Sequence, residues 1–294
     1  MIMKQKKIFA LGFFDGVHKG HQMVLDLCRH LADDAGVATA AITFEKHPQS
    51  LFTPNPPVLL NTTEDRCTLL RKYEIDEVFV LHVNEKTMSI PWDAFLEMLI
   101  EDGAVGFVCG YDFRFGQNSQ GTAEKLAAFA EERGLPCCIV EEQTMDGEKI
   151  SSTRIRALLE KGDLETANRL MGHFHMLTGT VVAGQKLGRT IGVPTANLPM
   201  PEGLVQLPFG VYACKAWVDG KHYIAVTNVG TRPTVNGKNV TVEPWILDFD
   251  GDLYGKEITL FFHKFLRPEQ KFGSLEALKS QIQKDAADTY KLLR

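Results

Sequence analysis

Residues 8–21 have the sequence IFALGFFDGVHKGH, in which an apolar run gives way to three glycines, an aspartate and two histidines. The apolar run, residues 8–13, has the length of a buried parallel strand. From Val24 onward, apolar residues recur at the spacing of an amphipathic helix. We therefore expect a strand, a glycine-rich loop and a helix, with His18 and His21 at or just before the first helical turn. The free N–H groups and the positive end of the helix dipole at that turn favour phosphate.

The two histidines, three residues apart, allow more than one interpretation. An isolated HxxH is also typical of two histidines on a helix surface, or of half of a metal site. Their place between a buried strand and a helix favours a third interpretation, a site of phosphate chemistry. In such a site, imidazoles stabilise the negative charge that develops when a phosphorus centre is attacked.

The next 120 residues alternate between strand and helix patterns. Strands are expected at residues 37–44, 76–83, 104–110 and 135–140, and helices at residues 62–73, 91–101 and 121–133. This alternation predicts a parallel sheet with right-handed crossovers. His47 follows the second strand and precedes Pro48, so it is placed either at the ligand-binding carboxyl edge of the sheet or in a structural turn.

Two further polar segments follow expected strands. Residues 111–116, YDFRFG, place aromatic rings beside Arg114, either to hold a planar ring and a phosphate or to pack the loop. Residues 149–156, KISSTRIR, open a helix with hydroxyl groups that cap free N–H groups, and Arg154 and Arg156 add cationic donors for phosphate. A capped basic helix without a ligand is the alternative.

Beyond Thr178 the pattern changes to short β-rich runs, which predict an antiparallel barrel or sandwich. A last helix is expected at residues 275–293. We expect one domain at residues 1–174 and a second at residues 175–294. His173 and His175, at the boundary, have the chemistry of metal ligands, but the lack of a third ligand at suitable spacing favours a linker.

The second domain has polar residues of its own. Gly184, Gly188 and Arg189 lie in a glycine-spaced loop that offers backbone amides to phosphate. Thr195 and Asn197 are two residues apart, so on an extended chain they share a face and offer oxygen atoms to a hard cation. A turn beside proline is the alternative.

Composition limits the partners. The 294 residues have a net charge of −5, which argues against a nucleic-acid-binding surface. The six cysteines form no CxxC pair, so we expect free thiols in a reducing compartment and no structural zinc. We expect no signal peptide, no membrane span and a cytoplasmic location. The oligomeric state is left open.

The motifs resemble those of known enzymes. GFFDGVHKGH resembles the HxGH signature of the FMN adenylyltransferase branch of the nucleotidylyltransferases, and GYDFRFG and KISSTRIR resemble its further motifs. Residues 179–198, GTVVAGQKLGRTIGVPTANL, together with residues 228–234, NVGTRPT, resemble the riboflavin kinase signature. Nearly the whole chain is thus similar to the bacterial bifunctional riboflavin kinase/FMN adenylyltransferase family, also called FAD synthetases.

This resemblance implies a fold and an activity. The fold is an α/β nucleotidylyltransferase domain with a Rossmann-like parallel sheet, followed by a mostly antiparallel β-barrel riboflavin kinase domain with a C-terminal helix. The activity is ATP-dependent phosphorylation of riboflavin to FMN, then adenylylation of FMN to FAD with release of pyrophosphate. Riboflavin, FMN and ATP are the implied partners and Mg²⁺ the implied cofactor. The alternatives are a monofunctional FAD synthetase with an inactive flavin-binding kinase domain, and a flavin-sensing module without activity.

The resemblance also implies residue roles. His18 and His21 stabilise the adenylyl transfer, Arg156 holds pyrophosphate, Glu243 is the general base of the kinase, and Thr195 and Asn197 hold the metal. The implied ligand-binding residues are Gly12, Phe14, Asp15, Gly20, His47, Asp112, Phe113, Arg114, Ser152, Thr153, Gly184, Gly188, Arg189, Asn228 and Arg267.

Overall fold

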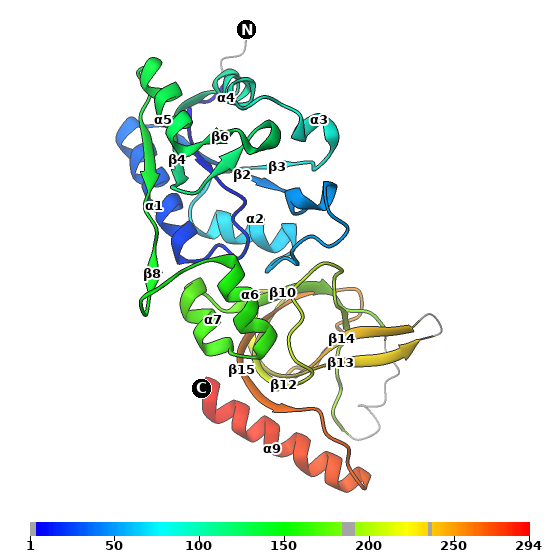
Figure 1. Ribbon diagram of the computed structural model, residues 1–294. Helices are drawn as coiled ribbons and strands as arrows, with labels where there is room; N and C mark the ends of the chain where they lie inside the picture. Colours follow the sequence, from blue (N-terminus) through cyan, green and yellow to red (C-terminus); the bar gives the residue numbers. More distant parts are fainter. Residues whose placement is uncertain (1–3, 184–191, 235–236) are drawn as a thin grey trace. The chain divides into compact units, whose positions relative to one another are not determined.

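The computed structural model describes residues 4–183, 192–234 and 237–294. The chain divides into two compact units, Met1–Arg154 and Ile155–Arg294, which are described separately (Figure 1). The first unit ends within the residues expected to form the amino-terminal domain. The extents predicted for the two domains, 1–174 and 175–294, stay predictions.

The first unit is built on a five-stranded parallel sheet with the order β3-β2-β1-β4-β7. Its strands are β1 (Lys7–Leu11), β2 (Ala38–Phe44), β3 (Glu77–Leu81), β4 (Ala104–Gly110) and β7 (Cys137–Val140). Every residue of the central strand β1 is buried, as the apolar run from Ile8 predicts, and the buried Lys7 at its start pairs with Glu77 at 2.7 Å. The predicted Rossmann-like parallel sheet is therefore confirmed.

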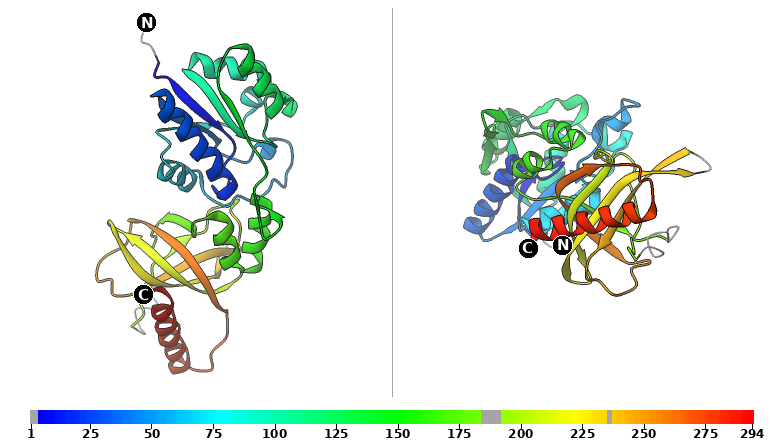
Figure 2. Two further views of the ribbon diagram at one scale, coloured as in Figure 1. Left: turned by 90° about the vertical axis from the view of Figure 1, so that its left-hand side faces the viewer. Right: turned by 90° about the horizontal axis from the view of Figure 1, so that it is seen from below.

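Helices cover both faces of this sheet (Figure 2). Helix α1 (Lys19–Ala35) packs on one face through Val24, Leu25 and Cys28. Helices α4 (Trp92–Glu101) and α5 (Ala123–Glu132) pack on the other, where Leu96 and Leu126 join a core with Phe9 and Leu11 of β1. The remaining elements of this unit are η1 (Pro48–Leu51), α2 (Thr63–Lys72), α3 (Glu85–Met88), β5 (Arg114–Phe115), η2 (Gln117–Ser119), β6 (Gly121–Thr122), β8 (Thr144–Met145) and β9 (Glu148–Lys149).

The second unit contains a six-stranded antiparallel sheet with the order β10-β15-β12-β13-β14-β11. Its strands are β10 (His175–Thr180), β11 (Leu198–Pro199), β12 (Gly210–Val218), β13 (Lys221–Thr234), β14 (Gly237–Ile246) and β15 (Glu257–Pro268). The two edge strands approach each other, because a Cβ built on Gly179 of β10 lies 3.5 Å from the side chain of Leu198 of β11. The sheet thus curls toward closure, which confirms the predicted barrel over a sandwich.

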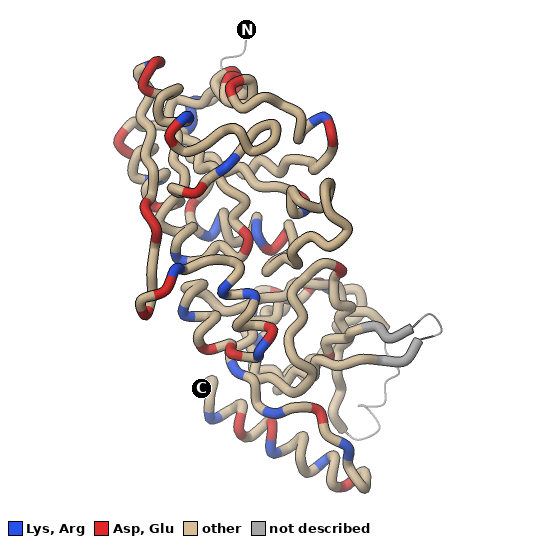
Figure 3. The backbone as a smooth tube through the Cα atoms, in the orientation of Figure 1, with Lys and Arg blue, Asp and Glu red and all other residues tan. Residues whose placement is uncertain are grey.

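In the described part of this unit, helices α6, α7 and α9 accompany the sheet. Helix α6 (Ser152–Lys161) begins in the first unit, and α7 (Leu164–Met171) packs on β15. Helix α9 (Leu275–Leu293) begins at the capping residue Ser274 and covers β12 and β13. Charges of both signs are distributed along α9 (Figure 3). Ala286 of this helix packs in a core with Val211 of β12 and Val226 of β13.

His175 is part of this framework. It is buried on β10, its N–H donates to Oδ1 of Asn168 at 2.7 Å, and burial lowers the pKa of its imidazole to about 4. The six cysteines are free, and four of them are buried. Among the residues that the structure describes, no helix has both the length and the apolar character that crossing a membrane requires.

Candidate functional sites

The loop after β1 has a strained backbone. Phe14 has φ +58° and Val17 has φ +37°, a region that a β-branched residue rarely enters. The Val17 N–H donates to the carbonyl of Phe14 at 3.0 Å, and the side-chain amide of Gln22 donates to the carbonyl of Val17 at 2.7 Å. Backbone strain held in this way is typical of functional loops.

This loop presents His18 and His21 as a stacked pair. Their ring centres are 3.6 Å apart and their planes differ by 12°. His18 is the N-cap of α1, and its Nδ1 accepts the N–H of His21 at 3.3 Å. An accepting Nδ1 leaves the hydrogen of a neutral His18 on Nε2. The predicted place of both histidines at the first turn of the helix is therefore confirmed.

His21 is held in its neutral form. Burial lowers the pKa of its imidazole well below the usual value, and the charges of His18 and Arg66 lower it further. The edge of the His21 ring packs against Phe14, with 5.3 Å between ring centres. At neutral pH the pair therefore offers N–H donors on a rigid support at the positive end of α1.

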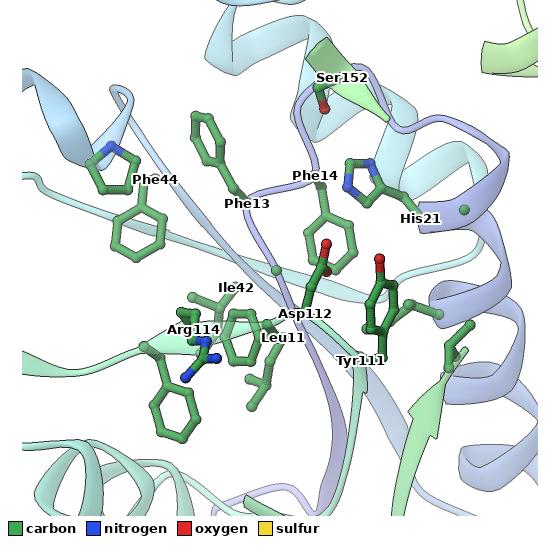
Figure 4. A pocket seen from close by; sticks show the side chains of 18 of the residues that line it. Leu11, Phe13, Phe14, His21, Ile42, Phe44, Tyr111, Asp112, Arg114 and Ser152 are labelled. Atoms are coloured by element: carbon green, nitrogen blue, oxygen red, sulfur yellow. The ribbon is translucent and has the colours of Figure 1, made fainter. Parts of the chain in front are cut away.

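A cavity of about 520 Å³ opens in front of the histidines (Figure 4). In Figure 4, His21 and Ser152 lie toward one end of the cavity and Arg114 lies toward the other. Its volume is in the range of small-ligand sites. It brings together most of the site residues that the sequence predicts for this unit: Gly12, Phe14, His18, Gly20, His21, Asp112, Phe113, Arg114, Ser152 and Thr153.

Aromatic rings form the apolar part of the wall. Phe113 and Phe115 stack with 5.2 Å between ring centres, and Phe95 packs against Phe115 at 5.9 Å. All three line the cavity. Flat apolar surfaces of this kind fit planar heterocycles such as flavin or adenine.

The hydroxyl cluster is joined to the histidine loop. The Ser152 hydroxyl donates to the carbonyl oxygen of Asp15 at 2.9 Å, and the Ser151 hydroxyl accepts the N–H of Arg154 at 3.2 Å. The carboxylate of Asp15 is buried and accepts the N–H of Leu60 at 2.8 Å. The two sequence motifs, about 130 residues apart, therefore form one site.

Three residues predicted for this site do not line the cavity. Asp15 lies beneath the loop, where it bonds to backbone. His47 caps the short helix η1 through its Nδ1, and its ring packs edge-on against Phe13 at 5.3 Å. Arg156 lies further along α6, in the second unit. Ligand contacts of these three residues stay predictions.

The cavity also contains residues that the sequence did not single out. Nζ of Lys149 donates to Oδ2 of Asp112 at 2.7 Å and to the hydroxyl of Tyr111 at 2.5 Å. These contacts raise the pKa of Lys149, so it stays charged. The position of Lys149, two residues before the hydroxyl cluster that begins at Ser151, was the available signal in the sequence.

The second unit has a small cleft and, beside it in the sequence, polar side chains just before β11 and on β14. The cleft, of about 60 Å³, is lined by Thr195, Pro244 and Tyr254, among others, but not by Asn197 or Glu243. The Ala196 N–H donates to the carbonyl of Pro244 at 2.9 Å, and Leu198 pairs with Val242. This register sets Asn197 opposite Glu243, so their side chains share a face.

The side chains on this face suit a cation. Asn197 is buried, and its Oδ1 has no hydrogen-bond partner among the described residues. A buried unpaired oxygen is costly unless a ligand completes it. Asn228 pairs with Glu243 across β13 and β14, and the Thr241 hydroxyl donates to Oε1 of Glu243 at 3.0 Å.

The remaining predicted residues of the second unit divide in two. Gly184, Gly188 and Arg189 lie outside the described residues. Arg267 forms a two-point ion pair with Asp285, with its Nη2 at 2.7 Å from Oδ2, and so ties β15 to α9. A ligand contact of Arg267 stays a prediction.

Comparisons with known proteins cover both units of the chain. A family model described as FAD synthetase matches residues 2–154, and one described as riboflavin kinase matches residues 171–293. The bifunctional riboflavin kinase/FMN adenylyltransferase of Listeria monocytogenes is 36% identical over 287 residues, which cover 96% of this chain and 91% of that protein. The Escherichia coli K12 protein of the same description is 34% identical over 282 residues, with coverages of 95% and 90%.

A solved structure shares the fold of the whole chain. The crystal structure of a Streptococcus pneumoniae protein described as a macrolide-efflux protein has a TM-score of 0.87 and 29% identity, and covers 98% of this chain and 95% of its own. The two family models and the full-length relatives confirm the prediction of a bifunctional enzyme over the monofunctional alternative. This chain belongs to the bifunctional riboflavin kinase/FMN adenylyltransferase family.

Proposed function

We propose that the cavity of the first unit catalyses adenylylation of FMN with His18 and His21 as its central groups. The observation that carries this assignment is the stacked histidine pair at the start of α1, facing a cavity that Ser152 and Thr153 also line. A phosphate oxygen of FMN attacks the α-phosphorus of ATP, the bond to the β-phosphate oxygen breaks, and pyrophosphate leaves. This reaction needs no protein nucleophile, because both reacting groups belong to the substrates.

We assign a separate role to each group of residues in this site. His18, His21 and the N–H groups of α1 stabilise negative charge that develops on the transferred and leaving groups. Ser152, Thr153 and Arg156 hold the leaving pyrophosphate. The wall of Phe113 and Phe115 binds a planar ring, and holding both substrates in line supplies much of the rate.

For the kinase reaction, we assign Glu243 as general base. Its carboxylate accepts the proton of the ribityl 5′-hydroxyl as that oxygen bonds to the γ-phosphorus of ATP, and ADP leaves. The Thr241 hydroxyl and the pairing with Asn228 support the assignment, because they fix the carboxylate on the face that it shares with Asn197.

We assign Mg²⁺ to Thr195 and Asn197. The buried Oδ1 of Asn197, which no described residue pairs, supports this, since Mg²⁺ prefers oxygen ligands. When bound, the ion neutralises phosphate charge. Gly184, Gly188 and Arg189 are proposed phosphate contacts on sequence grounds alone. The six free cysteines support a reducing, cytoplasmic location.

Flavin chromatography tests the proposal. Incubated with riboflavin, ATP and Mg²⁺, the protein is expected to form FMN first and FAD later. Chelation of the metal should stop the phosphorylation of riboflavin. If neither flavin forms, the enzymatic proposal is wrong, whereas conversion of FMN but not of riboflavin would restore the monofunctional alternative.

A further inference from the structure

Arg66 is a fully buried arginine that no step described above uses. It lies on α2, and its Nη2 donates to the carbonyl oxygen of Phe44. Its guanidinium carbon is 4.7 Å from the centre of the Phe13 ring. Its Nε and Nη1 are buried without a hydrogen-bond partner in the part of the chain that the structure describes. A buried cation with unused donors destabilises a fold, so packing alone does not account for it.

The two residues that Arg66 holds are parts of the cavity wall. Phe13 follows β1 and Phe44 ends β2, and both line the cavity, with 6.2 Å between their ring centres. Figure 4 shows the two rings near each other along the wall. Arg66 is not among the lining residues, so it lies behind this wall. It thereby connects the carboxyl ends of two neighbouring parallel strands, where the ligand site of such a sheet is formed.

The charge of Arg66 also reaches the histidine pair. A guanidinium stays protonated, and water screens a buried charge only weakly. Together with burial and the charge of His18, the charge of Arg66 lowers the pKa of His21. For Arg66 itself, burial lowers the pKa, and the negative charge of Asp15 raises it. Both substrates of adenylyl transfer are anions, so a fixed cation near their site reduces their repulsion. The other charged side chains of the wall are Asp112, Arg114, Glu141 and Lys149.

We propose that Arg66 is a positioning residue for adenylyl transfer, which fixes Phe13 and the end of β2 from behind the wall and supplies a permanent positive charge beneath the histidine pair. The role rests on the adenylylation assigned to this cavity. Its two parts are separable, because a lysine keeps the charge but cannot reproduce the planar contacts of a guanidinium.

The test compares Arg66→Met with Arg66→Lys, and with Arg71→Met on the exposed side of the same helix as a control. Arg66→Met should lower kcat/KM for FMN adenylylation about 10- to 100-fold, the size typical of residues that orient a site. It should also raise the pKa of the His21 imidazole, followed by NMR titration of labelled histidines. Arg66→Lys should recover part of the rate and the low pKa of His21, and Arg71→Met should change neither quantity.

Riboflavin phosphorylation by the second unit reports whether each variant chain is intact. Wild-type adenylylation and an unchanged His21 titration in Arg66→Met would overturn the proposal. If Arg66→Met does not fold, Arg66→Lys decides: a normally melting lysine variant whose His21 titrates at higher pH would also overturn it. The proposed function fails by a different result, namely no FAD formed from FMN by the unmodified protein.

Discussion

The two sites of this chain differ in how far the protein alone completes them. In the first unit, a cavity of about 520 Å³ is bounded by stacked histidines, aromatic rings and a strained loop whose polar groups bond to one another. In the second unit, the buried amide oxygen of Asn197 has no partner among the described residues, and the cleft of about 60 Å³ is lined by Thr195 and Ala196 but not by Asn197 itself. The first site offers protein donors that are already in place, whereas for the second we propose a cation as the partner of the amide oxygen.

The general base gives the largest expected effect. Glu243→Gln should lower the rate of riboflavin phosphorylation by about 10²- to 10⁴-fold, because an amide cannot take the proton of the hydroxyl. Conversion of supplied FMN to FAD should be unchanged, as measured by chromatography of the flavins. Glu257→Gln, an exposed strand position, is the matched control. Phosphorylation at the wild-type rate in Glu243→Gln would show that the base is another group.

The histidine pair gives the next largest effect, on the other reaction. His21→Ala should lower FMN adenylylation by about 10²- to 10³-fold through loss of a preorganised donor. Riboflavin should then accumulate as FMN. His30→Ala, exposed on the same helix, should make FAD normally. An equal loss in both variants would point to damage to α1 and not to transition-state stabilisation.

Substitution of the proposed metal ligand Asn197 should affect the kinase site alone. Asn197→Leu should raise the Mg²⁺ concentration needed for half-maximal kinase activity by about 10- to 100-fold, because the ion loses an oxygen ligand. Asn197→Asp, which keeps an oxygen ligand, should retain much more of the metal affinity. Riboflavin phosphorylation measured over a range of Mg²⁺ concentrations checks both. An unchanged requirement in Asn197→Leu would remove Asn197 from the metal site.

The smallest effect concerns the strained loop and is one of stability. Gly16 has φ +81°, and an added Cβ would lie 2.5 Å from the Leu60 side chain. Gly16→Ala should therefore lower the free energy of unfolding by about 1–3 kcal/mol. Gly36→Ala has a similar φ, +63°, but meets no atom within 4 Å, so it measures the backbone cost alone. Equal losses in thermal unfolding experiments would show that the contact with Leu60 is unimportant.

The sequence predicts the elements around both sites well, because local periodicity decides them. The apolar runs that form β1 and β4, and the helical spacing of apolar residues in α9, are recognised without knowledge of distant residues. Strand β13 is longer than the short runs that the sequence predicts: it extends from Lys221 to Thr234 and passes through Pro233. Beyond Val229, β13 pairs with β14 and no longer with β12. The missing backbone N–H of Pro233 therefore breaks no hydrogen bond that the sheet requires there.

Residues that act through tertiary packing were beyond prediction. Arg66 lies in the polar sequence TEDRCTLLRK, where an arginine is normally exposed, and its burial arises from Phe13 and Phe44, which belong to other elements. Lys149 likewise gains its role from Tyr111 and Asp112, which lie 38 and 37 residues earlier. Sequence motifs predict which groups contact the substrate, whereas the groups that support them become visible only in the folded structure.

The central claim, two separate sites for two consecutive reactions, is tested most directly by mixing the His21→Ala and Glu243→Gln variants. The measurement is the yield of FAD from riboflavin, ATP and Mg²⁺. We expect neither variant alone to form FAD, and an equimolar mixture to form it, because FMN released by the first is adenylylated by the second. A single substitution that abolishes both reactions, so that His21→Ala forms no FMN from riboflavin or Glu243→Gln does not convert supplied FMN, would contradict the claim.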